Sequence, residues 1–264
     1  MRLTVPRRLP VPLMYHGFTA DDRADDPYFL FVTGKAFADQ LDHLHHRGWD
    51  ALDLSEFLRR RANPKLGSPS FLITIDDGFV SVLDIAAPIL RARNVPAILF
   101  VPAAMVGGRT SWMTDMPDEQ LLDADGLRAL GEYGIEVGVH GFDHADMVGM
   151  TETMLRRQTV DARATIADIT GVSPRSFAYP SGAYDQLALR AVADAGFEVA
   201  FSTVRGSGGH AIPRIEVHSR DSLRLIDLKL LPGYRRVWRM GERVKPARAY
   251  ARRLLERRST APLA

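Results

Sequence analysis

The sequence predicts a parallel α/β fold, and three observations lead to it. Seven short apolar runs, most of them rich in Val, Ile and Phe, alternate with segments of helical periodicity, which is typical of repeated strand–helix units. The run 71–75 is largely apolar without alternation, as expected for a strand that is buried on both faces. A chain of 264 residues without an internal repeat also has the length of a single α/β barrel.

Each element follows from local pattern and punctuation. The apolar runs, bounded by turn residues, predict strands at 11–15, 71–75, 96–101, 135–139, 176–179, 197–202 and 215–217. The segments between them predict helices at 33–47, 54–61, 82–93, 119–130, 152–169 and 185–195. Thr33 and Thr151 are expected N-caps, and Gly48, Gly134 and Gly171 are expected helix stops.

Composition excludes several classes of function. The chain has no cysteine, so disulfides and thiol catalysis are excluded, and any metal site must use His and carboxylate ligands. No stretch approaches about 18 uninterrupted apolar residues, and the N-terminus lacks the apolar run of an export signal. We therefore expect a cytoplasmic protein.

Charge divides the chain into two parts. The net charge of +2 is made of +8 in residues 231–264, which hold ten Arg and Lys against two Glu, and −6 in the rest. We expect a barrel over 1–230 and a basic helical tail over 231–264. The tail has two interpretations. It is either a solvated helix packed on the barrel, or an interfacial helix over 234–258 that lies on the anionic surface of the inner membrane face. No nucleic-acid motif accompanies the charge, so no nucleic-acid partner is expected.

Reactive residue types collect where the predicted strands end. In parallel α/β barrels the active site lies at the carboxyl ends of the strands. The residues found there are His16, Asp76, Asp77, His140, Tyr179, Pro180 and His218.

Asp76 and Asp77 are open to two interpretations. An Asp-Gly pair after a strand is a common turn. Alternatively, Asp77 binds a metal and Asp76 transfers protons, because a bound cation allows two adjacent carboxylates to stay ionised.

His140 and His144 are four positions apart, which places both imidazoles on one face if the segment makes a helical turn. Together with Asp77 they would supply three ligands and leave one position for water, as catalytic metal sites do.

These motifs carry a family resemblance. The segment 74–78, Thr-Ile-Asp-Asp-Gly, resembles the T-F-D-D-G motif of polysaccharide deacetylases, the NodB-homology or carbohydrate esterase family 4 group. The pair His140 and His144 resembles the H-[ST]-x-x-H motif of that family. The segments 177–182 (Phe-Ala-Tyr-Pro-Ser-Gly) and 13–16 (Leu-Met-Tyr-His) resemble one branch, which includes exopolysaccharide deacetylases.

The resemblance implies a distorted (β/α)7 barrel and a divalent metal, usually zinc, with nickel, cobalt or manganese as alternatives. Asp77, His140 and His144 would hold the metal, and Asp76 would be the general base in removing acetyl from an N-acetylated glycan. The metal and a backbone N–H near Tyr179, in the segment with Pro180, would stabilise the oxyanion.

The chain departs from the family pattern in places. Gly141 stands where the family usually has Ser or Thr. Ala178 falls near the position where other branches carry an Arg beside the base, a role that Arg214 could fill unless it forms only a surface salt bridge. His16 is favoured over His218 as the general acid. Trp112, in the loop after the third strand, is expected either to stack on a sugar ring or to cover the underside of its loop.

Three functions remain open from the sequence. The first is a metal-dependent deacetylase that acts on an N-acetylated sugar, a polysaccharide or a lipid-linked glycan. The second is a metal-dependent amidohydrolase that acts on a small cyclic amide. The third is a degenerate glycan-binding protein without catalysis, for which the missing hydroxyl at Gly141 is the only argument.

Overall fold

The computed structural model describes residues 9–64, 68–113, 115–203, 206–231 and 233–234. The basic tail predicted for 231–264 falls almost entirely outside these residues, so the two interpretations of 234–258 stay predictions. Within the described ranges, no helix is both long enough and apolar enough to cross a bilayer.

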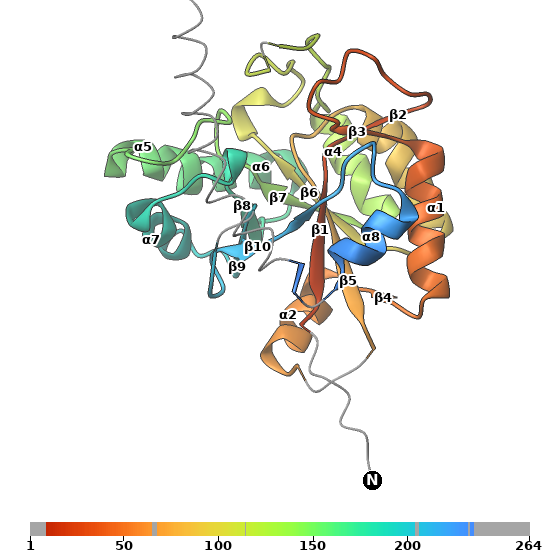
Figure 1. Cartoon of the computed structure of the whole chain (residues 1–264). Coiled ribbons are helices and arrows are strands. Elements are labelled where there is room, and N and C mark those ends of the chain that lie inside the picture. Colours follow the sequence, from red (N-terminus) through yellow and green to blue (C-terminus); the bar gives the residue numbers. More distant parts are fainter. Residues whose placement is uncertain (1–8, 65–67, 114, 204–205, 232, 235–264) are drawn as a thin grey trace, which may run out of the picture.

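A parallel sheet organises the molecule (Figure 1). Its strands run in the order β10, β9, β8, β7, β6, β5, β1, β11, and a short strand β4 pairs with β5 outside this order. The bounds are β1 (Val11–Tyr15), β4 (Asp50–Ala51), β5 (Ser70–Ile75), β6 (Ala97–Val101), β7 (Ile135–Val139), β8 (Ser176–Ala178), β9 (Val199–Ser202), β10 (Ile212–Pro213) and β11 (Ile215–Glu216). A separate pair joins β2 (Gly17–Thr19) to β3 (Phe31–Thr33). All seven predicted strands are present, whereas β2, β3, β4 and β10 were not predicted.

One interrupted segment closes the barrel. β10 and β11 are separated by a single residue, Arg214, yet β10 pairs with β9 and β11 pairs with β1. The segment 212–216 therefore connects the two ends of the sheet. The family-type distorted barrel that the motifs imply is the fold observed.

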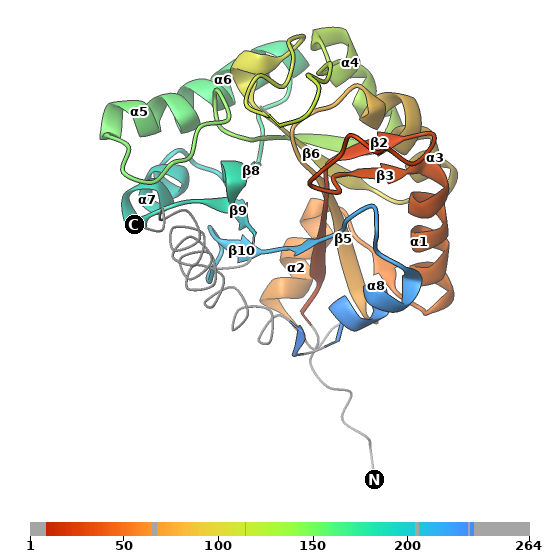
Figure 2. The same cartoon turned by 45° about the horizontal axis from the view of Figure 1, so that its top comes forward.

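Helices surround the strands, as Figure 2 shows for α1, α4, α6 and α7. The α-helices are α1 (Gly34–His46), α2 (Leu54–Ala62), α3 (Ala87–Ala92), α4 (Ala124–Ala129), α5 (Glu152–Arg156), α6 (Ala162–Thr170), α7 (Gln186–Asp194) and α8 (Leu223–Lys229). The shorter turns are η1 (Val82–Ala86), η2 (Ala103–Met105), η3 (Leu130–Tyr133), η4 (Arg157–Asp161) and η5 (Pro180–Gly182), of which η1 and η4 are π-helical.

The expected caps are present. The Thr33 and Thr151 hydroxyls accept the backbone N–H groups of Ala36 and Met154, which satisfies donors that a helix start leaves free. Gly134 and Gly171 end their helices with left-handed backbone. Local sequence therefore fixes where these helices begin and end.

An apolar cluster lies inside the barrel. Alternate side chains of the strands, among them Leu72, Phe100 and Phe201, form a buried cluster with Leu54 and Phe57 of α2. This cluster fills much of the barrel interior, and the carboxylates that follow β5 lie beyond it, at the carboxyl ends of the strands.

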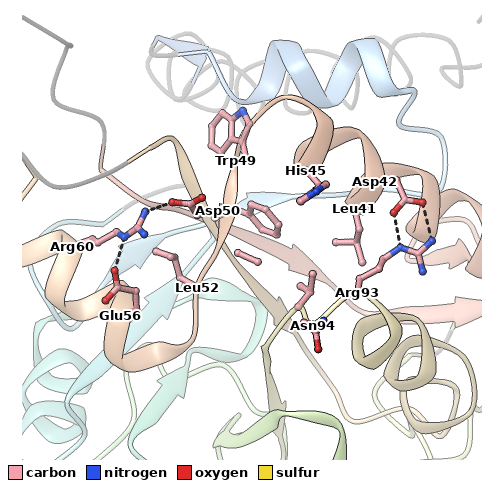
Figure 3. A pocket seen from close by; sticks show the side chains of 13 residues that line it. Leu41, Asp42, His45, Trp49, Asp50, Leu52, Glu56, Arg60, Arg93 and Asn94 are labelled. Atoms are coloured by element: carbon pink, nitrogen blue, oxygen red, sulfur yellow. Dashed lines mark hydrogen bonds and ion pairs between the residues drawn. The ribbon is translucent and has the colours of Figure 1, made fainter.

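A cavity of about 730 Å³ lies near the amino ends of the strands, beside β4 and the start of β5 (Figure 3). Its guanidinium groups are already paired, Arg60 with Asp50 and Glu56, and Arg93 with Asp42. The cavity is thus separated from the carboxylates that follow β5 by the length of that strand.

Candidate metal centre

The turn after β5 places the carboxylates of Asp76 and Asp77 at the carboxyl end of the barrel. The N–H of Asp76 donates to the carbonyl of Tyr15 at 3.0 Å, which extends the pairing of β5 with β1 by one residue. Asp77 then adopts a left-handed backbone with φ 76°, and Gly78 follows with φ 85°. A non-glycine residue in this region is strained, and such strain concentrates at functional sites. Both Asp side chains are buried.

Asp77, His140 and His144 converge on one point. One ligand atom from each lies within 4.8 Å of the others. The Asp77 Oδ1 is 3.6 Å from His140 Nε2 and 3.2 Å from His144 Nε2. Two ligands of a tetrahedral zinc ion, each about 2.1 Å from it, lie about 3.4 Å apart. The donor set and its spacing therefore fit a divalent cation.

His140 is prepared to act as a ligand. Its Nδ1 lies 2.8 Å from the carbonyl oxygen of Ala178, which can only accept, so Nδ1 carries the proton and Nε2 presents its lone pair to the site. Burial lowers the pKa of His140 to about 4. The imidazole is consequently neutral around pH 7, and a metal would not compete with a proton for it.

His144 is held by Trp112 and Asp77. The two rings stack with centroids 4.3 Å apart and an angle of 12°. Burial alone would lower the pKa of His144, but its hydrogen bond to Asp77 and the charge of that carboxylate raise it. One face of the Trp112 indole is therefore occupied by the imidazole, and its buried Nε1 has no hydrogen-bond partner among the described residues.

Asp77 stays ionised in this environment. Burial would raise its pKa, but the hydrogen bond from His144 and the charges of His144, His16 and His140 lower it well below the usual range. A carboxylate kept ionised in a buried position needs positive charge nearby. A bound cation would supply that charge without requiring a protonated imidazole.

Asp76 is paired with Arg214. The two guanidinium nitrogens Nη1 and Nη2 donate to the two carboxylate oxygens, each at 2.6 Å. The Arg214 side chain is 0% exposed and lies over the Phe100 ring at 5.6 Å, so it is not a surface salt bridge. Burial would raise the pKa of Asp76, but Arg214, His140 and His16 lower it, which keeps the carboxylate in its basic form.

The two candidate acids differ in their surroundings. His16 is near enough that its charge lowers the pKa of both Asp76 and Asp77, and its buried Nδ1 has no partner among the described residues. His218 lies at the barrel rim, where its Nε2 is 3.3 Å from the carboxylate of Glu216.

The segment around Tyr179 serves packing first. The Tyr179 side chain is fully buried and its hydroxyl donates to the His210 carbonyl at 2.9 Å. Its N–H donates to the Phe201 carbonyl, and Pro180 has no N–H. Any backbone donor to an acyl oxygen from this segment must therefore come after Pro180, and the Tyr179 side chain is in the core rather than at a substrate surface.

One residue at the site was not anticipated. Gln158 of η4 is buried, its Oε1 accepts the N–H of Phe142 at 2.7 Å, and its Nε2 donates to Asp143 at 2.7 Å. Both hydrogen-bond partners lie in the chain between His140 and His144, the two candidate metal ligands. The sequence did offer one indication of this role: Gln158 is a polar residue on the buried face of the predicted helix 152–169, and a buried amide needs hydrogen-bond partners.

Comparison with known proteins gives one family. The model of the family described as polysaccharide deacetylase matches residues 63–200. YxkH of Bacillus subtilis (strain 168) is 25% identical over 218 residues, which cover 80% of this chain and 72% of that protein. The poly-beta-1,6-N-acetyl-D-glucosamine N-deacetylase of Escherichia coli (strain K12) is 23% identical over 81% of this chain. The match spans 38% of that protein.

Solved structures share the fold. The Streptococcus pyogenes deacetylase PplD, in complex with acetate, superposes with a TM-score of 0.73 at 20% identity, over 84% of this chain and 98% of that chain. IcaB from Ammonifex degensii superposes with a TM-score of 0.70 at 24% identity, over 83% and 96% respectively. At these identities the likeness supports the barrel architecture.

Proposed function

Because this chain belongs to the polysaccharide deacetylase family, we propose that it is a metal-dependent hydrolase that removes acetyl groups from N-acetylglucosamine units of a glycan. One observation carries the proposal: Asp77, His140 and the partly exposed His144 offer donor atoms within 4.8 Å of one another, beside a second carboxylate whose pKa is lowered. The name of the Escherichia coli relative supports a β-1,6-linked polymer as the substrate class.

Asp77, His140 and His144 would hold the cation. A divalent cation bound there would supply Lewis acidity, which polarises the acyl carbonyl and acidifies a water molecule. Zinc suits two imidazoles and one carboxylate, and nickel, cobalt or manganese would be accepted by the same donors.

Asp76 would be the general base. Its carboxylate is ionised, is fixed by Arg214 and adjoins the Asp77 ligand, so it can accept a proton from a water molecule that attacks the acyl carbon. His16 would donate a proton to the leaving amine, because it is the histidine outside the proposed ligand set whose charge lowers the pKa of both carboxylates. His218, whose Nε2 lies 3.3 Å from the Glu216 carboxylate, would be the alternative proton donor.

The test measures acetate released from β-1,6-linked N-acetylglucosamine oligomers. Asp76→Asn should lower kcat by about 10³-fold or more while zinc stays bound, since it removes a base and no ligand. His140→Ala should lose zinc affinity together with activity. Full activity in Asp76→Asn would refute the assignment of the base.

The same assay separates the alternative functions. Acetate-free turnover of small cyclic amides, with no action on the oligomers, would indicate an amidohydrolase of another substrate class. Oligomer binding without hydrolysis at saturating zinc would indicate a glycan-binding protein.

A further inference from the structure

The loop between the two metal-type histidines is built without the hydroxyl residue that the family motif contains. Gly141 has a left-handed backbone with φ 74°. A Cβ atom on Gly141 would lie 2.8 Å from Gln158 Oε1 and 3.1 Å from Pro180 Cγ. The space that a Ser or Thr side chain would need is therefore filled by the Gln158 amide.

The amide of Gln158 forms one hydrogen bond at each of its ends. Oε1 accepts the N–H of Phe142, and Nε2 donates to the Asp143 carboxylate. Gln158 is 3% exposed, so a lost hydrogen bond to the Phe142 N–H would not readily be replaced by water. The two contacts fix consecutive residues at the centre of the 140–144 loop.

The other side of the loop is also anchored. The N–H groups of Ala103 and Ala104 donate to the carbonyls of Gly141 and Phe142 at 3.1 and 2.7 Å. The Arg157 guanidinium lies over the Phe142 ring at 4.5 Å. Within the described residues, the Gln158 Oε1 is the acceptor found for the Phe142 N–H, so losing Gln158 would release this side of the loop.

Gln158 comes from a π-helical turn. η4 interrupts the otherwise continuous helix formed by α5 and α6. Single π-turns within α-helices often occur at functional sites. Here the turn places Gln158 against the loop and Thr159 against its own helix, where the Thr159 hydroxyl donates to the Leu155 carbonyl at 2.8 Å.

We propose that Gln158 is a positioning residue for the metal centre: it takes the place of the motif's hydroxyl and sets the backbone path that aims His140 and His144 at one ion. The proposal rests on the metal-dependent function above. Residues that orient metal ligands typically change metal affinity about 10- to 100-fold when they are removed.

The first test compares two buried polar residues of the same π-turn. Gln158→Leu should raise the zinc Kd about 10- to 100-fold, measured by competition with a chromophoric chelator. It should also change the visible spectrum of the Co²⁺-substituted protein, which reports ligand geometry. Thr159→Val, the matched control, should leave the Kd and spectrum unchanged even if it lowers the melting temperature. Unchanged zinc affinity in a folded Gln158→Leu protein would overturn the proposal.

The second test exchanges the two polar groups and decides the matter if Gln158→Leu does not fold. Gln158→Glu alone places two carboxylates 2.7 Å apart and should weaken zinc binding. Adding Asp143→Asn restores a donor–acceptor pair and the original net charge, so the double variant should return to within about threefold of the wild-type Kd. A double variant no better than Gln158→Glu would also overturn the proposal.

The wild-type protein distinguishes the two levels of failure. If it binds no zinc, the metal-dependent function fails and the role of Gln158 fails with it. If it binds zinc and releases acetate, but the variants bind zinc equally well, only the role of Gln158 is refuted.

Discussion

At the scale of single residues, the pairing of Asp76 with Arg214 decides how the base behaves. A buried carboxylate is normally protonated more readily than one in water, because burial disfavours its charge. The bidentate guanidinium reverses that effect and lowers the pKa of Asp76. The carboxylate is therefore ionised, and its stabilising contribution is present, at any pH above its normal range. Both are lost as the pH falls through the lowered pKa.

Removing Arg214 should move the activity profile toward higher pH. In Arg214→Met, burial of Asp76 is no longer offset, so its pKa rises and the acid limb of kcat/KM shifts upward. A buried charge that loses its partner also costs on the order of 3–5 kcal/mol of stability. Arg214→Lys is the control, since it keeps the charge without the two-pronged geometry. The measurement is kcat/KM against pH, and an acid limb that does not move would contradict the argument.

At the scale of elements, some parts of the site could be predicted from the sequence and others could not. The turn after β5 and the end of β7 were predicted because apolar runs that end in acidic and histidine residues are local patterns. The helix 152–169 was also predicted, and α5, η4 and α6 cover it. Its π-turn was not predicted, because the periodicity of apolar residues does not distinguish α- from π-type hydrogen bonding within a single turn.

Restoring the hydroxyl of the family motif should harm this chain. Gly141→Ser forces a side chain onto φ 74° and against Gln158 Oε1, 2.8 Å from the new Cβ. Left-handed backbone at a non-glycine residue costs about 1–3 kcal/mol. Gly149→Ser is the matched control, because Gly149 has the same φ but no atom within 4 Å of its Cβ position.

Urea unfolding of the metal-free proteins measures the difference. In Gly149→Ser the free energy of unfolding should fall by the backbone cost alone. In Gly141→Ser it should fall further because of the contact with Gln158 and Pro180. Equal losses in the two variants would mean that the loop relaxes around the new side chain, and the steric argument would be wrong.

At the scale of the whole molecule, barrel closure assembles the site. The segment 212–216 joins β9 to β1 through β10 and β11, and the residue at the break is Arg214. Closing the barrel thus brings this guanidinium to Asp76, 138 residues earlier in the chain. The ligands likewise follow separate strands, β5 and β7, with β6 between them.

A metal that bridges separate strands should stabilise the fold as a whole. At zinc concentrations about 1,000 times Kd, linkage predicts about 4 kcal/mol, or roughly 10 °C in melting temperature for a domain of this size. His140→Ala should abolish most of this zinc-dependent shift, and because it also removes a buried hydrogen bond to Ala178 it should lower the metal-free melting temperature. Thermal scans with and without zinc provide the measurement, and a zinc-independent wild-type melting temperature would count against the site.

The sequence by itself determined seven of the strands, the helix caps and the family motifs, and through those motifs it predicted the three candidate metal ligands, because each strand, cap or motif is made of residues near one another in the chain. The tertiary structure decided the rest: that Arg214 is buried against Asp76 instead of lying on the surface, that the Tyr179 side chain belongs to the core, and that Gln158 fills the space at Gly141. These contacts join residues far apart in sequence, and burial then fixes their energetics. A buried polar group must find its partner across the fold, and no local pattern encodes which partner that is.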